Sequence, residues 1–243
     1  MSGHSKWHNI QAKKGKADAT RSSMFTKLSR AITMAARQGG GDPEMNFSLR
    51  LAVDKAKETN VPRENIERAI KRGTGELTDT AELHEVLYEG FGPGGVAVLI
   101  DTVTDNTNRT VSDVKHLLSK HGGSLGGPGS VLWQFTRSGV IRFSSKTKQQ
   151  FSDWDAAQLA CMDAGAEDIL DSPEGAEIMT PYTKLQSVLR ALAPFGIVAD
   201  DSGLEWHAKE IITVDREAEE QLDALYSALE ALDDVRGVFT NLA

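Results

Sequence analysis

The sequence has a single cysteine, Cys161, and no long run of apolar residues. One cysteine cannot form an internal disulfide bond, and it excludes a metal site built on several cysteines. No segment approaches the roughly 18 uninterrupted apolar residues of a membrane span. The first residues, MSGHSKWHNIQAKKGK, contain no apolar core of the kind found in secretory signals. We therefore expect a cytoplasmic protein without a membrane partner.

Patterns that support catalysis or cofactor binding are also scarce. Gly90, Gly92 and Gly95 match the G-x-G-x-x-G spacing of dinucleotide sites, but Pro93 interrupts them. A strand-like segment follows where such a site needs a helix, so a hairpin turn is the favoured interpretation. The histidines are scattered without the spacing of metal ligands. We expect no enzyme activity, no bound metal and no cofactor.

Charge is divided unevenly along the 243 residues, although the net charge of the whole sequence is only −8. Residues 1–75 contain fifteen Lys and Arg against seven Asp and Glu, a net charge of +8. Residues 76–243 contain twelve against twenty-eight, a net charge of −16. This asymmetry predicts a polyanion as the partner of the basic part.

The basic part begins with an arm and a first helix. Residues 1–20 show no hydrophobic periodicity, which is typical of an extended or mobile segment. Phe25, Leu28, Ile32 and Ala35 then recur at the spacing of one helical face, until a run of three glycines ends the pattern.

Two more helices are expected before residue 75. Asp42 and Pro43 form a start signal, with Asp as the N-cap and Pro at the first helical position. Met45 and Leu49 then fall on the buried face of this second helix. Pro62 opens the third helix. Three short helices joined by tight turns predict a small bundle.

Strand-like and helical segments alternate after residue 75, and this mixture predicts an α+β fold of one or two sandwiches. Strands are expected near 84–89, 96–103, 131–135, 140–143, 169, 176–179, 197–200, 204–207, 211–214 and 235–239. Helices are expected at 108–121, 154–164, 183–193 and 217–232.

Basic side chains are predicted to cover the surface of the N-terminal domain. At 100° per residue, the first and third helices place their basic residues roughly opposite their apolar faces. The arm adds lysines and a tryptophan that could stack on a base. The candidate nucleic-acid-binding residues are Lys6, Trp7, Lys13, Lys14, Lys16, Arg21, Lys27, Arg30, Arg37, Arg68, Lys71 and Arg72. The alternative is a charged outer surface that is simply solvated.

Four long segments carry a resemblance that extends over nearly the whole chain. They are GHSKWHNIQAKKGKADATRSSMFTKL, GGGDPEMNFSLRLAVDKAKETNVPRENIERAIKRGTGE, YEGFGPGGVAVLIDTVTDNTNR and GGSLGGPGSVLWQF. These segments closely resemble the YebC family of probable transcriptional regulators. A mitochondrial relative is a translational activator of cytochrome c oxidase, and bacterial members are implicated as ribosome-associated translation factors.

The resemblance implies a three-helix N-terminal domain followed by two α/β sandwich domains, one inserted in the other. The implied domains are residues 1–75, residues 76–131 with 210–243, and the inserted residues 132–209. The basic arm of the family corresponds here to Lys6, Trp7, Lys13, Lys14 and Lys16.

Three functions remain open at this point. In the first, the basic domain binds DNA and regulates transcription, with Arg63 and Asn65 at the start of a recognition helix. In the second, a ribosome-associated translation factor inserts the arm into ribosomal or transfer RNA to relieve stalling. In the third, the protein is an acidic protein–protein adaptor whose basic arm is incidental.

Overall fold

The computed structural model describes residues 19–77 and 81–243, and the chain divides into two compact units. The first unit contains the chain up to Phe135 together with Ala208–Ala243, and the second contains Thr136–His207. The second unit is therefore inserted in the sequence of the first. The expected division into three domains, with boundaries near 75, 131 and 209, stays a proposal.

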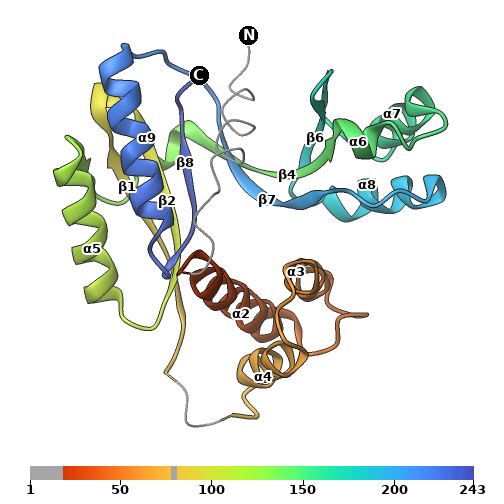
Figure 1. Ribbon diagram of the computed structural model, residues 1–243, viewed down its shortest axis with the longest axis horizontal. Helices are drawn as coiled ribbons and strands as arrows, with labels where there is room; N and C mark the ends of the chain where they lie inside the picture. The colour runs from red at the N-terminus through yellow and green to blue at the C-terminus, as the bar shows by residue number, and fades with distance from the viewer. Residues whose placement is uncertain (1–18, 78–80) are drawn as a thin grey trace. The chain divides into compact units, whose positions relative to one another are not determined.

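Three helices form the N-terminal part of the first unit, namely α2 (Ala19–Gly39), α3 (Phe47–Glu58) and α4 (Arg63–Gly73) (Figure 1). Their facing apolar side chains form one core. Its buried members are Ile32, Ala35, Ala36, Leu49, Val53, Ala56, Val61, Ile66 and Ala69. Because α2 contributes only part of its circumference to this core, another side of the helix stays available for other contacts.

The predicted start of the second helix at Asp42 is wrong, because Asn46 caps α3 instead. The Oδ1 atom of Asn46 accepts a hydrogen bond from the N–H of Leu49 at 3.1 Å, and its Nδ2 donates to the carbonyl of Ala35 at 2.7 Å. These buried bonds fix the cap four residues later than the sequence suggested. Met45 therefore precedes the helix and is 86% exposed, so its expected place in the core is also wrong.

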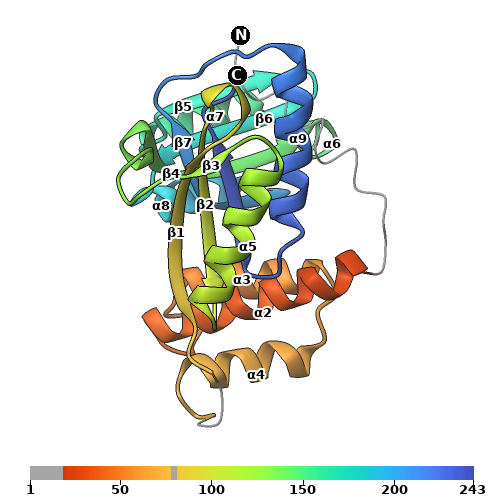
Figure 2. The same ribbon diagram turned by 90° about the vertical axis from the view of Figure 1, so that its left-hand side faces the viewer.

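A four-stranded antiparallel sheet in the order β3-β1-β2-β8 forms the rest of the first unit. Its strands are β1 (His84–Phe91), β2 (Ala97–Thr104), β3 (Ser124–Leu125) and β8 (Val235–Thr240). Helices α5 (Thr107–Lys120) and α9 (Arg216–Glu230) cover one face of the sheet (Figures 1 and 2). Phe91 pairs with Ala97 across the turn between β1 and β2, which confirms a hairpin at the glycines.

Three of the expected strands are not regular strands in the structure. Residues 132–134 form a short 3-10 turn, residues 197–200 form no strand, and the 211–214 segment makes only an isolated bridge from Ile212 to Leu242. The first case has a clear cause, because the amides of Val131 and Leu132 donate to the carboxylate of Glu89 instead of to a neighbouring strand.

The second unit contains a sheet in the order β5-β6-β4-β7. Its elements are β4 (Phe135–Ser144), α6 (Ser145–Lys148), α7 (Trp154–Asp163), β5 (Asp168–Ser172), β6 (Gly175–Pro181), α8 (Leu185–Leu192) and β7 (Asp201–Ala208). This succession of two strand–helix–strand halves is a split β-α-β arrangement. The two sheets with their helices confirm the α+β class.

A buried ion cluster lies on β4 of the second unit. Both terminal nitrogens of Arg142 donate to the carboxylate of Glu205, at 2.6 and 2.7 Å, and its Nε donates to Glu177 at 2.6 Å. Burial lowers the pKa of Arg142, but the bonds and charges of these carboxylates more than reverse this effect, and the pKa is raised. Arg142 is therefore a fixed structural cation.

Candidate nucleic-acid interface

The predicted arm residues Lys6, Trp7, Lys13, Lys14 and Lys16 lie outside the described residues. Arg21 belongs to α2, but its side chain is also outside the described part of the chain. The proposed contacts of these six residues with nucleic acid stay predictions.

Helix α4 presents two of the predicted basic residues to solvent. Ile66 and Ala69 are buried toward the helical core, whereas Arg68 and Lys71 are exposed on the other side of α4. Neither basic side chain forms an ion pair within the described residues. Their charges are therefore accessible to a phosphate backbone.

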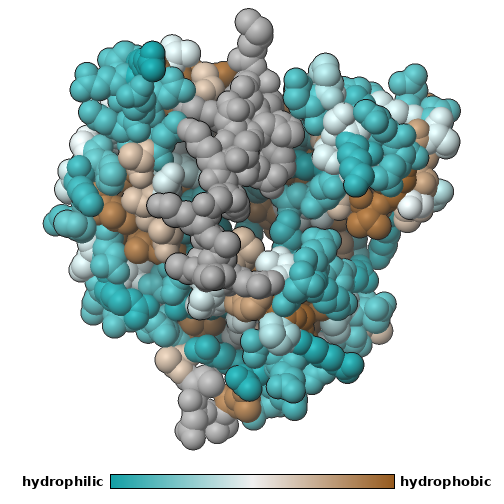
Figure 3. Space-filling model, in the orientation of Figure 1, coloured by the Kyte–Doolittle hydropathy of each residue, from teal (hydrophilic) through white to brown (hydrophobic). Residues whose placement is uncertain are grey.

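Exposed ion pairs accompany these residues on α3 and α4. Lys57 pairs with Asp54 at 3.1 Å, and Arg63 pairs with Glu67 at 2.7 Å. Pairs of this kind contribute about 0–1 kcal/mol each, so they stabilise the helices only slightly. On the face shown in Figure 3, hydrophilic residues cover most of the three-helix region.

Helix α2 uses two of its predicted basic residues to hold the turn between α9 and β8. One Nη1 atom of Arg30 donates to the Oδ1 of Asp234 at 2.6 Å and to the carbonyl of Asp233 at 2.7 Å. Lys27 donates to the carbonyl of Glu230 at the end of α9. These cations lie opposite the helical core, as predicted, but the C-terminal turn covers them.

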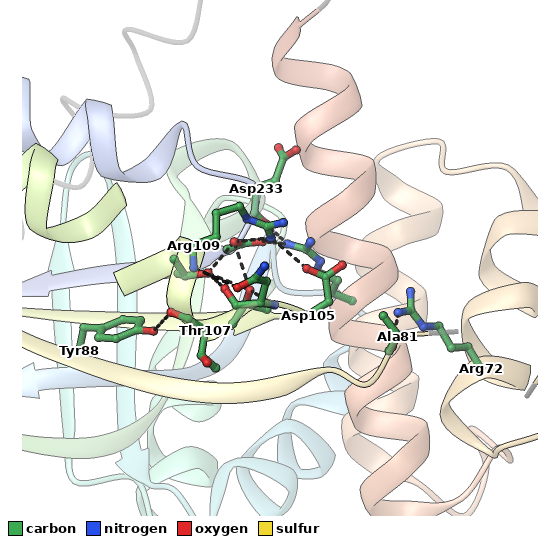
Figure 4. Close-up of polar contacts among 12 residues, drawn as sticks. Arg72, Ala81, Tyr88, Asp105, Thr107, Arg109 and Asp233 are labelled. Carbon is green, nitrogen blue, oxygen red and sulfur yellow. Dashed lines mark hydrogen bonds and ion pairs between the residues drawn. The ribbon is translucent and has the colours of Figure 1, made fainter. Parts of the chain in front are cut away.

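Asp234 is the centre of a polar cluster and is only 7% exposed. Besides Arg30, it accepts hydrogen bonds from Nη2 of Arg109 at 2.9 Å, from Thr110 at 2.7 Å and from Thr104 at 3.2 Å. Figure 4 shows Arg109 and Asp105 beside the pale red ribbon of α2. Burial raises the pKa of Asp234, but the bonds from Arg109 and Thr110 outweigh burial and lower it below its ordinary value. Asp234 therefore remains an ionised carboxylate at neutral pH.

Arg37 and Arg72 hold the segment that enters β1. Arg37 donates to the carbonyl of Leu83 at 2.7 Å and pairs with Glu82 at 2.6 Å. Arg72 donates to the carbonyl of Ala81 at 2.7 Å, a contact drawn in Figure 4. These bonds give both arginines a role in joining the helices to the sheet.

Six predicted contact residues thus have described side chains, and they divide into two groups. Arg68 and Lys71 are exposed and make no ion pair within the described residues, whereas Lys27, Arg30, Arg37 and Arg72 bind other parts of the first unit, although Arg37 is also exposed. Sequence reasoning missed Asp234 and Arg109 altogether. Nothing local could have revealed them, because 204 residues separate Asp234 from Arg30.

Glu89 fixes the loop between β3 and β4, whose residues 126–130 read GGPGS and are called the glycine-rich loop below. Its buried carboxylate accepts hydrogen bonds from the amides of Gly129 at 2.6 Å, Val131 at 2.7 Å and Leu132 at 2.8 Å. Burial raises the pKa of Glu89, but these three backbone bonds outweigh it and the pKa is lowered. Three amides that could have held a phosphate already hold a protein carboxylate.

Other kinds of site find no support in the described chain. Within residues 19–77 and 81–243, no group of three or more His, Cys, Asp or Glu side chains could hold a metal ion. Cys161 is buried, and burial raises the pKa of its thiol to about 11, so the thiol stays protonated and a poor nucleophile at neutral pH. None of the helices in the same ranges is long and apolar enough to cross a membrane.

Fold and surface together define a modular α+β protein in which a basic helical domain is bound to an acidic sheet domain with an inserted unit. Two family models cover almost the whole chain. Residues 5–76 match the TACO1/YebC protein N-terminal domain, and residues 83–242 match the TACO1/YebC second and third domain. The chain belongs to the TACO1/YebC family.

Similar proteins are known from several bacteria. A probable transcriptional regulatory protein of Pseudothermotoga lettingae is 47% identical over 99% of this chain and 93% of its own length. A probable transcriptional regulatory protein of Chloroflexus aggregans is 48% identical over 100% of this chain and 95% of its own length. The crystal structure of a conserved hypothetical protein from Aquifex aeolicus has a TM-score of 0.84 at 39% identity, covering 95% of this chain and 94% of that one. The names of the two relatives describe regulators and not enzymes.

Proposed function

We propose that the chain is a nucleic-acid-binding regulator of gene expression that binds DNA through its basic N-terminal domain. The observation that carries this proposal is the separation of charge, +8 in residues 1–75 and −16 in the remainder. The names of the relatives point to transcriptional regulation. A short turn, with Asn60 in the left-handed conformation at φ 60°, joins α3 to α4 and fits a helix-turn-helix.

The exposed face of α4 supplies the described part of this interface. Arg68 and Lys71 would neutralise phosphates, and the arm with Lys13, Lys14 and Lys16 would extend the contact. The net charge of −16 on residues 76–243 favours the approach of a polyanion from the basic end. The cytoplasm remains the expected compartment, and the proposal requires no cofactor.

Salt dependence of binding tests this interface. The Arg68→Ala/Lys71→Ala variant should bind labelled duplex DNA more weakly, and the slope of log Kobs against log salt should fall by about one per lost contact. Lys115→Ala/Lys120→Ala is a matched control, because it removes two exposed cations from α5 in the acidic part. Equal losses in both variants, or no binding by the unmodified protein, would exclude the proposed interface. Equal affinity for specific and scrambled duplexes would remove its sequence-specific form.

A second candidate is a ribosome-associated translation factor that inserts the arm into ribosomal or transfer RNA. The first turns of α4 favour it, because Arg63 is paired with Glu67 and Glu64 is exposed beside it. Carboxylates at that position oppose the close approach of a phosphate backbone to a recognition helix. Sedimentation with stalled ribosomes and sequencing of crosslinked nucleic acid would separate the two candidates. If Lys13, Lys14 and Lys16 can be replaced by Ala without effect on activity, this result favours the third hypothesis, an acidic protein–protein adaptor.

A further inference from the structure

Trp133 has an exposed indole at the end of the glycine-rich loop. The residue is 67% exposed and follows Leu132 in the 3-10 turn before β4. A tryptophan is among the largest apolar side chains, and leaving it in water forgoes the free energy that its burial would supply. The indole is therefore accessible to a ligand, and the contacts of its segment decide whether it is also held in place.

One hydrogen bond holds the indole and a second holds the backbone of the same residue. Its Nε1 donates to the carbonyl of Ser130 at 3.2 Å, which limits rotation of the ring. The carbonyl of Trp133 accepts a hydrogen bond from the Nζ of Lys209 at 2.7 Å. The Lys209 ammonium is therefore held at the backbone of the residue that carries the exposed indole.

The backbone beneath Trp133 is held on both sides. Glu89 binds the amides of Val131 and Leu132 before it, as described above. After it, the carbonyl of Gln134 accepts from the amide of Lys209 at 2.8 Å. Little conformational entropy is lost when a ligand binds to a surface that is already ordered.

The loop next to Trp133 leaves room for a flat ligand. Gly127 and Gly129 are exposed, and no atom lies within 4 Å of the place where a Cβ would stand on either residue. Protein interfaces usually surround a tryptophan anchor with a closely packed, desolvated shell. The exposed residues 127–129 precede Trp133 in the chain, and Lys209 binds its carbonyl; small side chains and one ammonium group suit a planar ring joined to a phosphate better.

We propose that Trp133 is a stacking platform for one unpaired nucleobase, and that the Lys209 ammonium meets the phosphate next to that base. This inference rests on the proposed nucleic-acid-binding function and adds a second contact in the middle of the chain. The ligand is a single-stranded segment, because a base inside a duplex cannot offer its face to the indole. Aromatic stacking of this kind is sequence-tolerant.

Binding of labelled oligonucleotides to the full-length protein tests the platform. The probes are a 12-nucleotide single-stranded RNA, a DNA of the same sequence, and a blunt duplex without unpaired bases. Trp133→Ala should weaken single-strand binding about tenfold, in keeping with about 1–3 kcal/mol for one stacked base, and should change duplex binding less than twofold. Trp133→Phe should retain most of the affinity. The preferred strand identifies RNA or DNA as the source of the base.

Tyr182→Ala is the matched control, because it removes another exposed aromatic residue, 58% exposed, from the second unit. Its single-strand affinity should equal that of the unmodified protein. Quenching of tryptophan emission on binding should also diminish in Trp133→Phe. Unchanged single-strand affinity in Trp133→Ala, or an equal loss on single strands and duplex, would overturn the platform alone. If the unmodified protein binds none of the three probes, the proposed function fails as well.

Discussion

Asp234 carries its charge in a nearly closed space between Arg30 and Arg109, with two threonine hydroxyls completing the set of donors. The side chains of Asp234 and Arg30 are largely buried, at 9% and 14% exposure, so loss of the carboxylate would leave the Arg30 guanidinium without its charge partner. The cluster joins α2 to the C-terminal turn. Its loss should therefore affect both stability and the attachment of the helices.

Asp234→Ala should lower the free energy of unfolding by about 3–5 kcal/mol, the usual cost of removing one partner from a buried ion pair. Urea denaturation followed by circular dichroism measures this change. The neighbouring Asp233→Ala is a matched control, because the Asp233 side chain is exposed and only its carbonyl binds Arg30. A control as unstable as Asp234→Ala would show that net charge, and not the cluster, determines stability.

Acid should also act through Asp234. Its folded-state pKa is lowered, so its contribution to stability is present above the unfolded value of about 3.9 and is lost as pH falls through the folded value. Asp234→Asn should therefore have a flatter dependence of stability on pH below about pH 4 than the unmodified protein. Denaturation midpoints between pH 2.5 and pH 7 check this. Identical slopes would mean that Asp234 does not contribute to acid unfolding.

At the scale of the element, α2 and α4 cross at Gly73. A Cβ on this glycine would lie 2.4 Å from the carbonyl oxygen of Thr33 and 2.6 Å from the Cβ of Ala36. Both neighbouring atoms belong to the backbone or to a Cβ of α2, so they cannot move away by a change of side-chain rotamer. The close approach explains why a residue without a side chain ends α4.

Gly73→Ala should destabilise the three-helix region by about 1–3 kcal/mol, the usual range for overpacking. Thermal unfolding of the variant reports the change. Gly127→Ala is the control, since nothing lies within 4 Å of its added Cβ, and it should unfold close to the unmodified protein. Equal stability of the two variants would contradict the close crossing.

Elements with strong local patterns could be predicted from the sequence, whereas features that depend on distant residues could not. The periodicity of α2 and the hairpin at Phe91 needed only neighbouring residues. Asn46 and not Asp42 caps α3, because the side-chain amide of Asn46 also donates a hydrogen bond to α2. This is a tertiary contact that a local pattern does not contain. The basic residues of α2 and α4 were placed opposite the apolar faces, but a pattern cannot tell whether another segment covers the basic side of a helix. Arg30 shows this limit most clearly.

At the scale of the whole molecule, the two chain segments that lead to and from the second unit lie next to each other in the first unit. The amide of Lys209 donates to the carbonyl of Gln134 at 2.8 Å, and the Nδ2 of Asn241 donates to the Oε1 of Gln134 at 3.1 Å. The two connecting segments are thus held together by the first unit. The first unit has its own buried core around Ile100 and Leu225.

Deletion of residues 136–207, with a short Gly-Ser link between Phe135 and Ala208, should leave a folded first unit. The expected result is a cooperative thermal transition and unchanged duplex affinity, because the basic helices and the Asp234 cluster remain. A scrambled-order fusion of the same two segments serves as the control for nonspecific collapse. A deletion protein without a cooperative transition would show that the inserted unit is needed for folding of the first.

The long separation between Arg30 and Asp234 also has a consequence for synthesis. The ribosome makes α2 before the inserted unit, and it makes α9 and β8 after that unit. Throughout this interval the nascent chain carries Lys27 and Arg30 without the acceptors that later cover them. The surface of the helical domain is therefore more strongly basic in the nascent chain than in the folded protein. It becomes less basic only when α9 and β8 have folded against it.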